Sequence, residues 1–283
     1  MEVTDPAGVM PQLTAAIARL EVRAMAPRFF LGTHRPSWLA RTEIPLFVSA
    51  VQLRGRRTFP RALGPWALDS GGFSELQLHG RWTVDARTYA AEVRQWASAI
   101  SMPAFAAIQD WMCEPFMLGK TGLSVAEHQR RTIESYLTLR DLAPEIPWMP
   151  VVQGWAAPDY LDHVDAYERA GVDLRELPIV GVSSICRRQA TDRAFRIISA
   201  IASEGIRIHA FGVKSDGLDS FGSLIASADS MAWSFVARRR PVLMDGCSGH
   251  INCANCLRWA LEWRLSRIVE RGGAQTAMPW WLA

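Results

Sequence analysis

The sequence contains few lysines, few cysteines and no long apolar run. Only Lys120 and Lys214 are lysines among the 31 basic residues, a bias typical of a GC-rich coding genome. The net charge of +3 neither indicates nor excludes a nucleic-acid partner. The sequence contains no apolar stretch of about 18 residues, which is the length that predicts a membrane span. The first thirteen residues lack a basic stretch followed by an apolar run, so we expect no secretory signal and a cytoplasmic protein.

Three of the five cysteines lie in one short segment. Cys247, His250, Cys253 and Cys256 recur at three-residue intervals. Zinc prefers four thiolate or imidazole ligands in a tetrahedron, and a Cys-x-x-Cys pair turns both sulfurs onto one ion. This spacing predicts a structural zinc site, in which a distant side chain could replace His250. The competing interpretation is a chance cluster of buried or redox-active cysteines.

Eight short apolar runs alternate with helical stretches over most of the 283 residues. Nearly continuous hydrophobicity is typical of parallel strands buried on both faces, and helical crossovers between them favour a parallel sheet. Eight strands favour a closed (β/α)8 TIM-like barrel over an open sheet. We expect one domain over 1–283, with a C-terminal zinc-binding subdomain at about 245–270. The expected strands are 29–33, 45–53, 66–73, 105–111, 148–155, 178–183, 206–213 and 228–235, and the clearest helices are 85–100, 124–142, 158–170, 190–204 and 257–270.

Carboxylates and a carboxamide stand at several predicted strand ends. Asp69 leaves its run into a Gly-Gly turn, Asp110 and Gln153 end the fourth and fifth runs, and Asp229 lies in the eighth. Each has an ordinary structural interpretation, such as a helix cap or an Asx-turn. In a TIM barrel, however, all C-terminal strand ends meet at the mouth, where the chemistry takes place. His209, inside the seventh run, is more typical of a core histidine.

These motifs, in this order, resemble the tRNA-guanine transglycosylase superfamily. The similar segments are Asp69-Ser-Gly-Gly-Phe73, the Asp110 strand end, Val152-Gln153-Gly154, the Gly181 strand, His209-Ala-Phe-Gly212, Asp229-Ser230 and the terminal Cys/His cluster. They extend from about Phe29 to Trp263. The family fold, an eight-stranded barrel with a C-terminal zinc subdomain, agrees with the barrel expected from the apolar runs.

The resemblance implies a role for each matching residue. Asp229 matches the nucleophile that attacks the sugar C1′, and Asp69 matches the general acid/base. Asp110 and Gln153 match the groups that read the guanine edge, and Gly181 matches a backbone contact to the base. The remaining expected substrate-binding residues are Ser70, Gly71, Gly72, Phe73, Gly154 and Trp233. Breaking a glycosidic bond builds positive charge on the sugar, which a carboxylate can stabilise and then bond.

Two departures from the tRNA enzymes bear on the substrate. The segment after Asp229 is Ser-Met-Ala-Trp-Ser, and nearby Asp219 is an alternative match for the nucleophile. The first cysteine lies six residues upstream of Cys253, and no histidine follows Cys256. A compact zinc cluster in a short chain is similar to the phage and bacterial branch that places 7-deazaguanines into DNA. We therefore expect a pentosyltransferase that replaces guanine in DNA with a 7-deazaguanine such as the 7-cyano compound.

A base must leave its stack to reach a barrel mouth. Trp111, Trp155, Trp233 and Phe73 are candidates to sandwich it, although core packing is the competing interpretation. Arginines in two loops, above all Arg56, Arg57, Arg238 and Arg239, are candidates for phosphate contacts.

The expected partners are DNA and a free 7-deazaguanine, with no membrane. The sequence leaves open a homodimer or a partner subunit. The alternatives for function are a tRNA-guanine transglycosylase and a non-catalytic nucleic-acid-binding subunit of the same fold.

Overall fold

The computed structural model describes residues 27–185, 191–240, 242–245, 247–248 and 250–269. All strands pair in parallel in one sheet. Each of the eight predicted apolar runs contains a strand, although the strands are shorter than the runs. The strands are β1 Arg28–Thr33, β2 Leu46–Ser49, β3 Trp66–Asp69, β4 Ala106–Ala107, β5 Trp148–Met149, β6 Val151–Val152, β7 Val180–Val182, β8 Ile208–Ala210 and β9 Ser227–Ser230.

The sheet closes into a barrel through Pro150. The strand order is β5-β4-β3-β2-β1-β9-β8-β7-β6, so β5 and β6 stand at the two ends of the sheet. These two strands are consecutive in the chain and only Pro150, which has no N–H to donate, separates them. β5 pairs with β4 and β6 pairs with β7, so one chain segment joins both ends. The predicted (β/α)8 TIM-like barrel is confirmed, with its fifth strand split in two.

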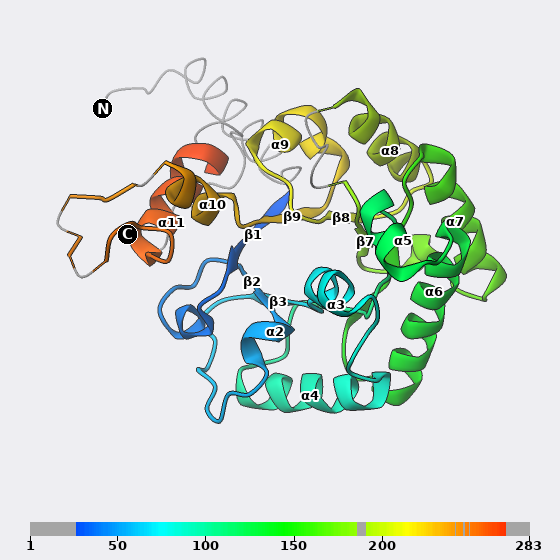
Figure 1. Ribbon diagram of the computed structural model, residues 1–283, viewed down its shortest axis with the longest axis horizontal. Coiled ribbons are helices and arrows are strands. Elements are labelled where there is room, and N and C mark those ends of the chain that lie inside the picture. The colour runs from blue at the N-terminus through cyan, green and yellow to red at the C-terminus, as the bar shows by residue number, and fades with distance from the viewer. Residues whose placement is uncertain (1–26, 186–190, 241, 246, 249, 270–283) are drawn as a thin grey trace, which may run out of the picture.

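Helices surround the strands in a ring (Figure 1). The predicted strand 228–235 ends at Ser230, and a helix begins at Ala232. The run 45–53 similarly turns into one helical turn. The helices are η1 Pro36–Ala40, α2 Ala50–Leu53, α3 Gly72–His79, α4 Ala86–Ala99, α5 Pro115–Thr121, α6 Val125–Leu142, α7 Ala157–Arg169, η2 Leu174–Glu176, α8 Asp192–Ser203, α9 Ser215–Phe221, η3 Gly222–Leu224, α10 Ala232–Arg239, α11 Leu257–Arg264 and the π-helical η4 Leu265–Val269.

Side-chain caps mark the start of two of the long helices. The side chains of Asp85 and Ser124 accept hydrogen bonds from the backbone N–H groups of Thr88 and Glu127 and so cap α4 and α6. Of the predicted helical ranges, residue 190 and residue 270 lie outside the described residues. No described helix has the length and apolarity needed to cross a bilayer.

Two apolar layers fix the barrel. The larger layer lies between the strands and the surrounding helices and includes Leu31, Val48 and Leu68. A smaller cluster fills the barrel with the alternate residues of the same strands: Phe30, Phe47, Ala67, Phe105, Ala107 and Met149. Because successive residues of a strand point to opposite faces, burial on both sides explains the continuous hydrophobic runs. The packed interior leaves the chemistry to the C-terminal strand ends.

Candidate active site and metal centre

Asp69 ends β3 and is held inside the mouth by its neighbours. Its carboxylate accepts hydrogen bonds from the Ser49 side chain, which is its partner in the β2–β3 register, and from the Gly71 backbone. Burial raises the pKa of Asp69, and the negative charge of Asp229 raises it further. Asp69 is therefore a carboxyl group that holds its proton more tightly than a solvated aspartate does, as a general acid requires.

The two glycines after Ser70 let the chain turn tightly over the site. Gly71 has a φ of 82° and caps α3, and a Cβ there would lie 2.6 Å from Cγ2 of Val51. A Cβ on Gly72 would lie 3.2 Å from Oδ1 of Asp110. The turn thus brings the backbone against the second aspartate, to which the buried Ser70 hydroxyl donates a hydrogen bond at 3.4 Å.

Asp110 and Gln153 form one buried polar group. The Gln153 Nε2 donates a short hydrogen bond to Oδ2 of Asp110, and both side chains are almost fully buried. Burial raises the pKa of Asp110 to about 7, and the charges of Asp69 and Glu114 contribute in the same direction. A carboxylate next to an amide N–H offers an acceptor beside a donor, which is the complement of the guanine edge.

The backbone of Gln153 is fixed from behind. Its N–H donates to Nδ1 of His163 at 2.8 Å, and its carbonyl accepts from Nε2 of Gln129 at 2.8 Å. Burial lowers the pKa of His163 to about 3, so its ring is neutral and Nδ1 can accept. The next residue, Gly154, packs closely, since a Cβ there would lie 2.8 Å from the Tyr160 ring.

Asp229 lies in β9, and one of its carboxylate oxygens is held by a backbone N–H and lies close to a histidine ring. Its Oδ1 accepts from the Gly212 N–H at 2.9 Å and lies 3.4 Å from Nε2 of His209. The Nδ1 of His209 lies 2.8 Å from the Ser227 hydroxyl. Asp229 is 7 % exposed, whereas the alternative nucleophile Asp219 is exposed on α9. The geometry therefore favours Asp229 over Asp219 as the carboxylate at the mouth.

His209 occupies the barrel interior below Asp229. Its ring lies 4.9 Å from the rings of Phe105 and Phe211 and 5.5 Å from that of Phe47. Gly181 leaves room for this arrangement, because a Cβ there would lie 2.6 Å from Cε2 of Phe211. His209 is thus a core histidine, as expected, and one of its ring nitrogens faces the nucleophile candidate.

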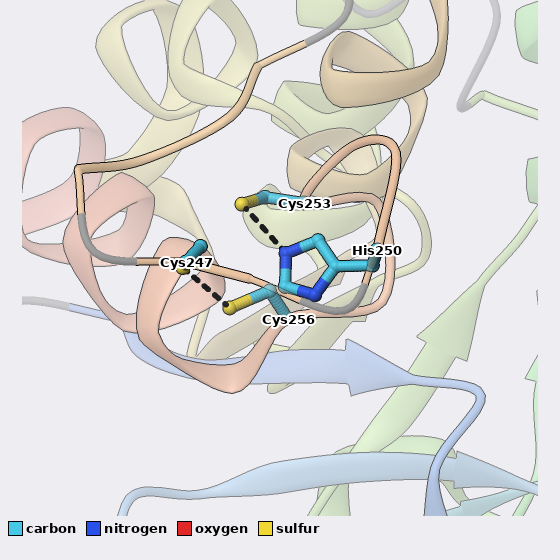
Figure 2. A group of neighbouring side chains, drawn as sticks. All are labelled: Cys247, His250, Cys253 and Cys256. Carbon is cyan, nitrogen blue, oxygen red and sulfur yellow. Dashed lines mark hydrogen bonds between the residues drawn. The ribbon is translucent and has the colours of Figure 1, made fainter.

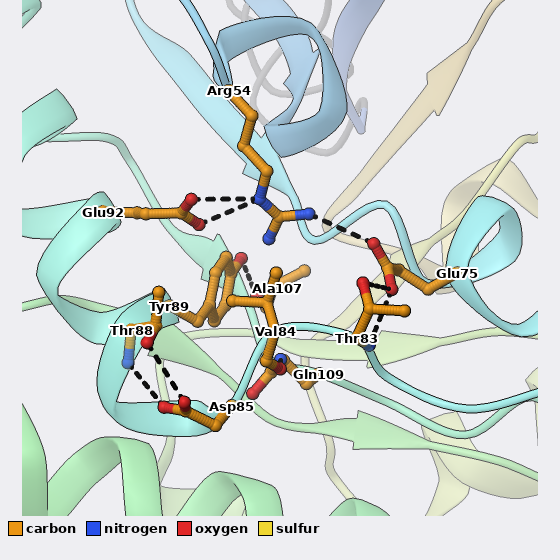
Figure 3. A network of polar contacts seen from close by, with 10 residues as sticks. All are labelled: Arg54, Glu75, Thr83, Val84, Asp85, Thr88, Tyr89, Glu92, Ala107 and Gln109. Carbon is orange, nitrogen blue, oxygen red and sulfur yellow. Dashed lines mark hydrogen bonds and ion pairs between the residues drawn. The ribbon is translucent and has the colours of Figure 1, made fainter. Parts of the chain in front are cut away.

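A cluster of charged side chains links the end of α2 to α3 and α4 (Figure 3). Arg54, just after α2, pairs with Glu92 of α4 at 2.9 Å and with Glu75 of α3 at 3.4 Å. Glu75 also accepts two hydrogen bonds from Thr83. The Arg54 guanidinium lies 5.9 Å from the centre of the Tyr89 ring, whose hydroxyl donates to the Ala107 carbonyl in β4. Arg54 therefore ties α3 and α4 together behind the mouth.

The aromatic candidates differ in how much ring surface they offer. Trp233 is fully buried on α10 and donates to the Gly32 carbonyl, which favours core packing over a base platform. Trp111 is 8 % exposed, and Arg131 covers one ring face at 4.6 Å. Arg193 lies 5.3 Å from the Trp155 ring. Phe73 is 36 % exposed at the start of α3, next to the Asp69 turn, and is the most open of the four.

The four candidate phosphate-binding arginines are exposed. Arg56 and Arg57 lie in the loop after α2. Arg238 bonds to His34 and Ser234, and Arg239 lies 4.5 Å from the Phe235 ring, which is itself half exposed. Both pairs are free of carboxylate partners among the described residues.

The four metal-ligand candidates come together between α10 and α11 (Figure 2). The ligand atoms of Cys247, His250, Cys253 and Cys256 all lie within 4.8 Å of one another. The Sγ atoms of Cys247 and Cys256 are 3.9 Å apart, and Nε2 of His250 is 3.2 Å from Sγ of Cys253. A zinc–sulfur distance of about 2.3 Å gives tetrahedral edges of about 3.8 Å, so this cluster could hold a metal ion.

The cluster joins the two last helices. Cys256 is the N-cap of α11, and the loop that carries the cluster is tied to α10 by the Ser234 hydroxyl, which donates to the Ala254 carbonyl at 2.8 Å. The indole of Trp259 in α11 donates to the Trp233 carbonyl at 3.0 Å. A metal bound here would thus stabilise the packing of α11 against α10.

The described residues thus form a TIM-like parallel barrel with three aspartates at its mouth and a Cys/His cluster beside its last helices. The family described as "DpdA: DeoxyPurine in DNA protein A" matches residues 25–280. The chain belongs to this family, the branch that modifies DNA with 7-deazaguanines, and the resemblance identified from the sequence is confirmed. No curated protein matches the chain.

The sequence assigns no role in the site to four of its polar residues: Ser49, Glu114, Ser184 and His209. The Ser184 hydroxyl lies 2.9 Å from Oε1 of Gln153 and 3.0 Å from Oε2 of Glu114. The one available signal was position, since Ser184 follows the sixth run and Ser49 lies in the second.

Proposed function

We propose that this protein exchanges guanine in DNA for a free 7-deazaguanine, such as the 7-cyano compound, through a covalent intermediate in which Asp229 holds the sugar. The observation that carries the proposal is the convergence of three aspartates at the mouth of a barrel whose family acts on deoxypurines in DNA. The desolvated carboxylates argue against a non-catalytic subunit. Burying a carboxyl group costs folding free energy, and a protein without a reaction to catalyse has no use for such a group.

Asp229 acts as the nucleophile. Its Oδ1 is held by Gly212 and faces His209, which leaves Oδ2 for the anomeric carbon. As the C1′–N9 bond breaks, its electron pair goes to the guanine and a new C1′–Oδ bond forms. The Ser227 hydroxyl and the His209 ring keep the carboxylate orientation fixed during this displacement.

Asp69 moves the proton. The departing guanine takes the Asp69 proton, so the base leaves neutral and Asp69 becomes a carboxylate. The incoming 7-deazaguanine then returns a proton from its N9 to Asp69 while N9 attacks C1′, and the Asp229 carboxylate is released. Each bond broken is matched by one formed, so no further reactant is needed. The raised pKa of Asp69 suits both directions of this transfer.

Asp110 and Gln153 select the base. An ionised Asp110 accepts from N1–H and the 2-amino group, and Gln153 Nε2 donates to O6. The substituent at position 7 lies on the opposite edge of the base and does not enter this pattern. Guanine and its 7-deaza analogues therefore bind the same way, which an exchange reaction requires.

The Cys247, His250, Cys253 and Cys256 cluster binds one structural Zn²⁺. Four soft protein ligands leave no open coordination position, so the ion contributes folding energy and no chemistry. The barrel and this segment behave as one domain over 1–283, of which residues 1–26 and 270–283 lie outside the described residues.

The test is a direct measurement of base exchange. Purified protein is incubated with single-stranded DNA, duplex DNA or tRNA and each labelled 7-deazapurine, and the polymer is digested to nucleosides and weighed. We expect label in DNA. Asp229→Asn should abolish the exchange while polynucleotide binding stays within about twofold, because the amide keeps the shape but cannot attack. Asp69→Ala should also show no exchange.

Three outcomes would contradict the proposal in different ways. Label in tRNA alone would favour the tRNA enzyme. Label in neither polymer would favour the non-catalytic subunit. A protein–DNA adduct that persists in Asp229→Asn, or maps to Asp219, would show that the nucleophile is assigned wrongly.

A further inference from the structure

We propose that Ser184 is a positioning residue that sets the preference of the site for the O6 side of the base, and that it does so by fixing the carboxamide of Gln153. This inference rests on the proposed function and deepens it. Ser184 does not itself touch the base, and it is not among the residues that match the transglycosylase motifs.

The backbone at Ser184 is the first observation. Its φ is 60°, and it is the one non-glycine residue with positive φ in the part of the chain that the structure describes. Such a conformation is uncommon for a residue with a side chain and persists where the surroundings enforce it. Ser184 lies two residues after the end of β7, and this turn brings its side chain against Gln153 at the barrel mouth. A strained residue at this point indicates a positional requirement for the side chain.

The hydroxyl of Ser184 has a defined set of neighbours. It accepts a hydrogen bond from the Cys113 N–H at 3.1 Å, and its oxygen lies 2.9 Å from Oε1 of Gln153 and 3.0 Å from Oε2 of Glu114. All of these residues are buried. The hydroxyl has one proton to donate, and we assign it to Oε1 of Gln153, its nearer acceptor; the NH2 group of Gln153 then faces Asp110, where the contact is observed.

The orientation of the carboxamide decides which base edge the site accepts. With NH2 toward Asp110, Gln153 presents a donor to O6, an acceptor on guanine and on 7-deazaguanine. A flipped carboxamide would present its oxygen to O6 and also to the Asp110 carboxylate, and both contacts would be repulsive. Without the Ser184 hydroxyl, Oε1 loses its donor and the carboxamide is less well held. The loss of one such bond corresponds to about a fivefold change in an equilibrium constant.

Three free bases separate the O6 contact from the rest of the site. 7-Deazaguanine makes every contact. Its 6-thio analogue keeps N1–H and the 2-amino group but replaces O6 with a weak acceptor, so it reports on Gln153. 7-Deazahypoxanthine lacks the 2-amino group, so it reports on Asp110. Equilibrium binding of each base to the full-length protein is measured by calorimetry, together with KM and kcat for exchange into DNA.

We expect Ser184→Ala to reduce the preference for 7-deazaguanine over its 6-thio analogue by about fivefold. The preference over 7-deazahypoxanthine should stay within about twofold of the unmodified protein. KM for the base should rise while kcat changes little, because Asp229 and Asp69 are untouched. A general loss of structure would lower both preferences and kcat together.

Matched variants keep the test decisive. Ser184→Gly also removes the hydroxyl, and glycine adopts a φ of 60° without strain. This variant should therefore show the same reduced preference even where the alanine variant folds poorly. Glu114→Gln retains a hydrogen-bonding partner for the Ser184 hydroxyl and should keep the O6 preference within about twofold. Ser183→Ala removes a hydroxyl that does not bond to Gln153 and should change neither preference.

The inference is overturned if Ser184→Gly keeps the O6 preference of the unmodified protein, or if Ser183→Ala lowers it equally. This failure is distinct from failure of the proposed function. Selective binding of 7-deazaguanine without exchange into any polymer would count against the transglycosylase, whereas exchange with an unaltered O6 preference in both Ser184 variants would count against Ser184 alone.

Discussion

Asp110 is expected to destabilise the folded protein at neutral and alkaline pH. Its carboxyl is 4 % exposed, and burial raises its pKa from 3.8 to about 7. The folded state therefore binds a proton more tightly than the unfolded chain between these two values. Because the unfolded state then carries fewer protons, stability falls as pH rises from about 4 to about 7 and stays low above it.

The expected magnitude follows from the two pKa values. Keeping Asp110 in the fold costs at most about 2 kcal/mol at pH 5 and about 4 kcal/mol at pH 8, relative to a group that does not titrate. Asp110→Asn removes the titration while keeping the volume, and the new amide can still accept the hydrogen bond from Gln153. The variant should be more stable than the unmodified protein, and the difference should grow by about 2 kcal/mol between pH 5 and pH 8.

The measurement is the free energy of unfolding in urea for both proteins at several pH values between 5 and 8. Asp69→Asn, also at the mouth, is a useful comparison because the pKa of Asp69 is raised as well. A stability difference that does not depend on pH, or an Asp110→Asn variant that is less stable at pH 8, would refute the electrostatic reasoning. The same variant should bind 7-deazaguanine weakly, since an amide replaces one of the two acceptor oxygens with an N–H donor that opposes N1–H or the 2-amino group.

Three further predictions concern the scaffold. Cys253→Ala should lower the metal content from one zinc per chain to near zero and lower the melting temperature, and plasma emission analysis that finds no zinc in the freshly purified unmodified protein would contradict it. Gly181→Ala should destabilise the fold by about 1–3 kcal/mol in urea, because the new Cβ meets the Phe211 ring, whereas Gly119→Ala, where a Cβ meets nothing within 4 Å, should be neutral or stabilising. Arg54→Lys should raise KM and lower stability, because one ammonium cannot pair with both Glu75 and Glu92. Arg207→Lys, at an exposed position just before β8 and away from the mouth, should leave both unchanged.

The barrel could be predicted because hydrophobicity along a parallel strand reports burial on both faces. The strand ends could not be located in the same way. In the run 228–235 the apolar character continues past Ser230, because Trp233 of α10 packs into the core as fully as a strand residue does. The division of the fifth strand at Pro150 could not be predicted either, since the residues on its two sides pair with different strands, β5 with β4 and β6 with β7.

The aspartates of the site could be predicted because they follow apolar runs, and every such position meets at one mouth. The groups that hold them could not. Ser184 and Glu114 are 70 residues apart, and Ser184 and Gln153 are 31 apart, so no local pattern links them. Each belongs to a residue type that is common in loops. Only the closure of the barrel brings these side chains to one buried point.

The environments of the three aspartates differ in a way that supports their separate roles. One oxygen of Asp229 accepts from the Gly212 N–H and lies 3.4 Å from Nε2 of His209, so its other oxygen is the one available for attack. Desolvation and the charge of Asp229 both raise the pKa of Asp69, so its proton is held more tightly. A carboxyl that holds its proton tightly beside a second carboxyl is a common arrangement of a general acid and a nucleophile. Asp110, whose pKa of about 7 allows it to ionise when a base offers N–H groups, completes this division.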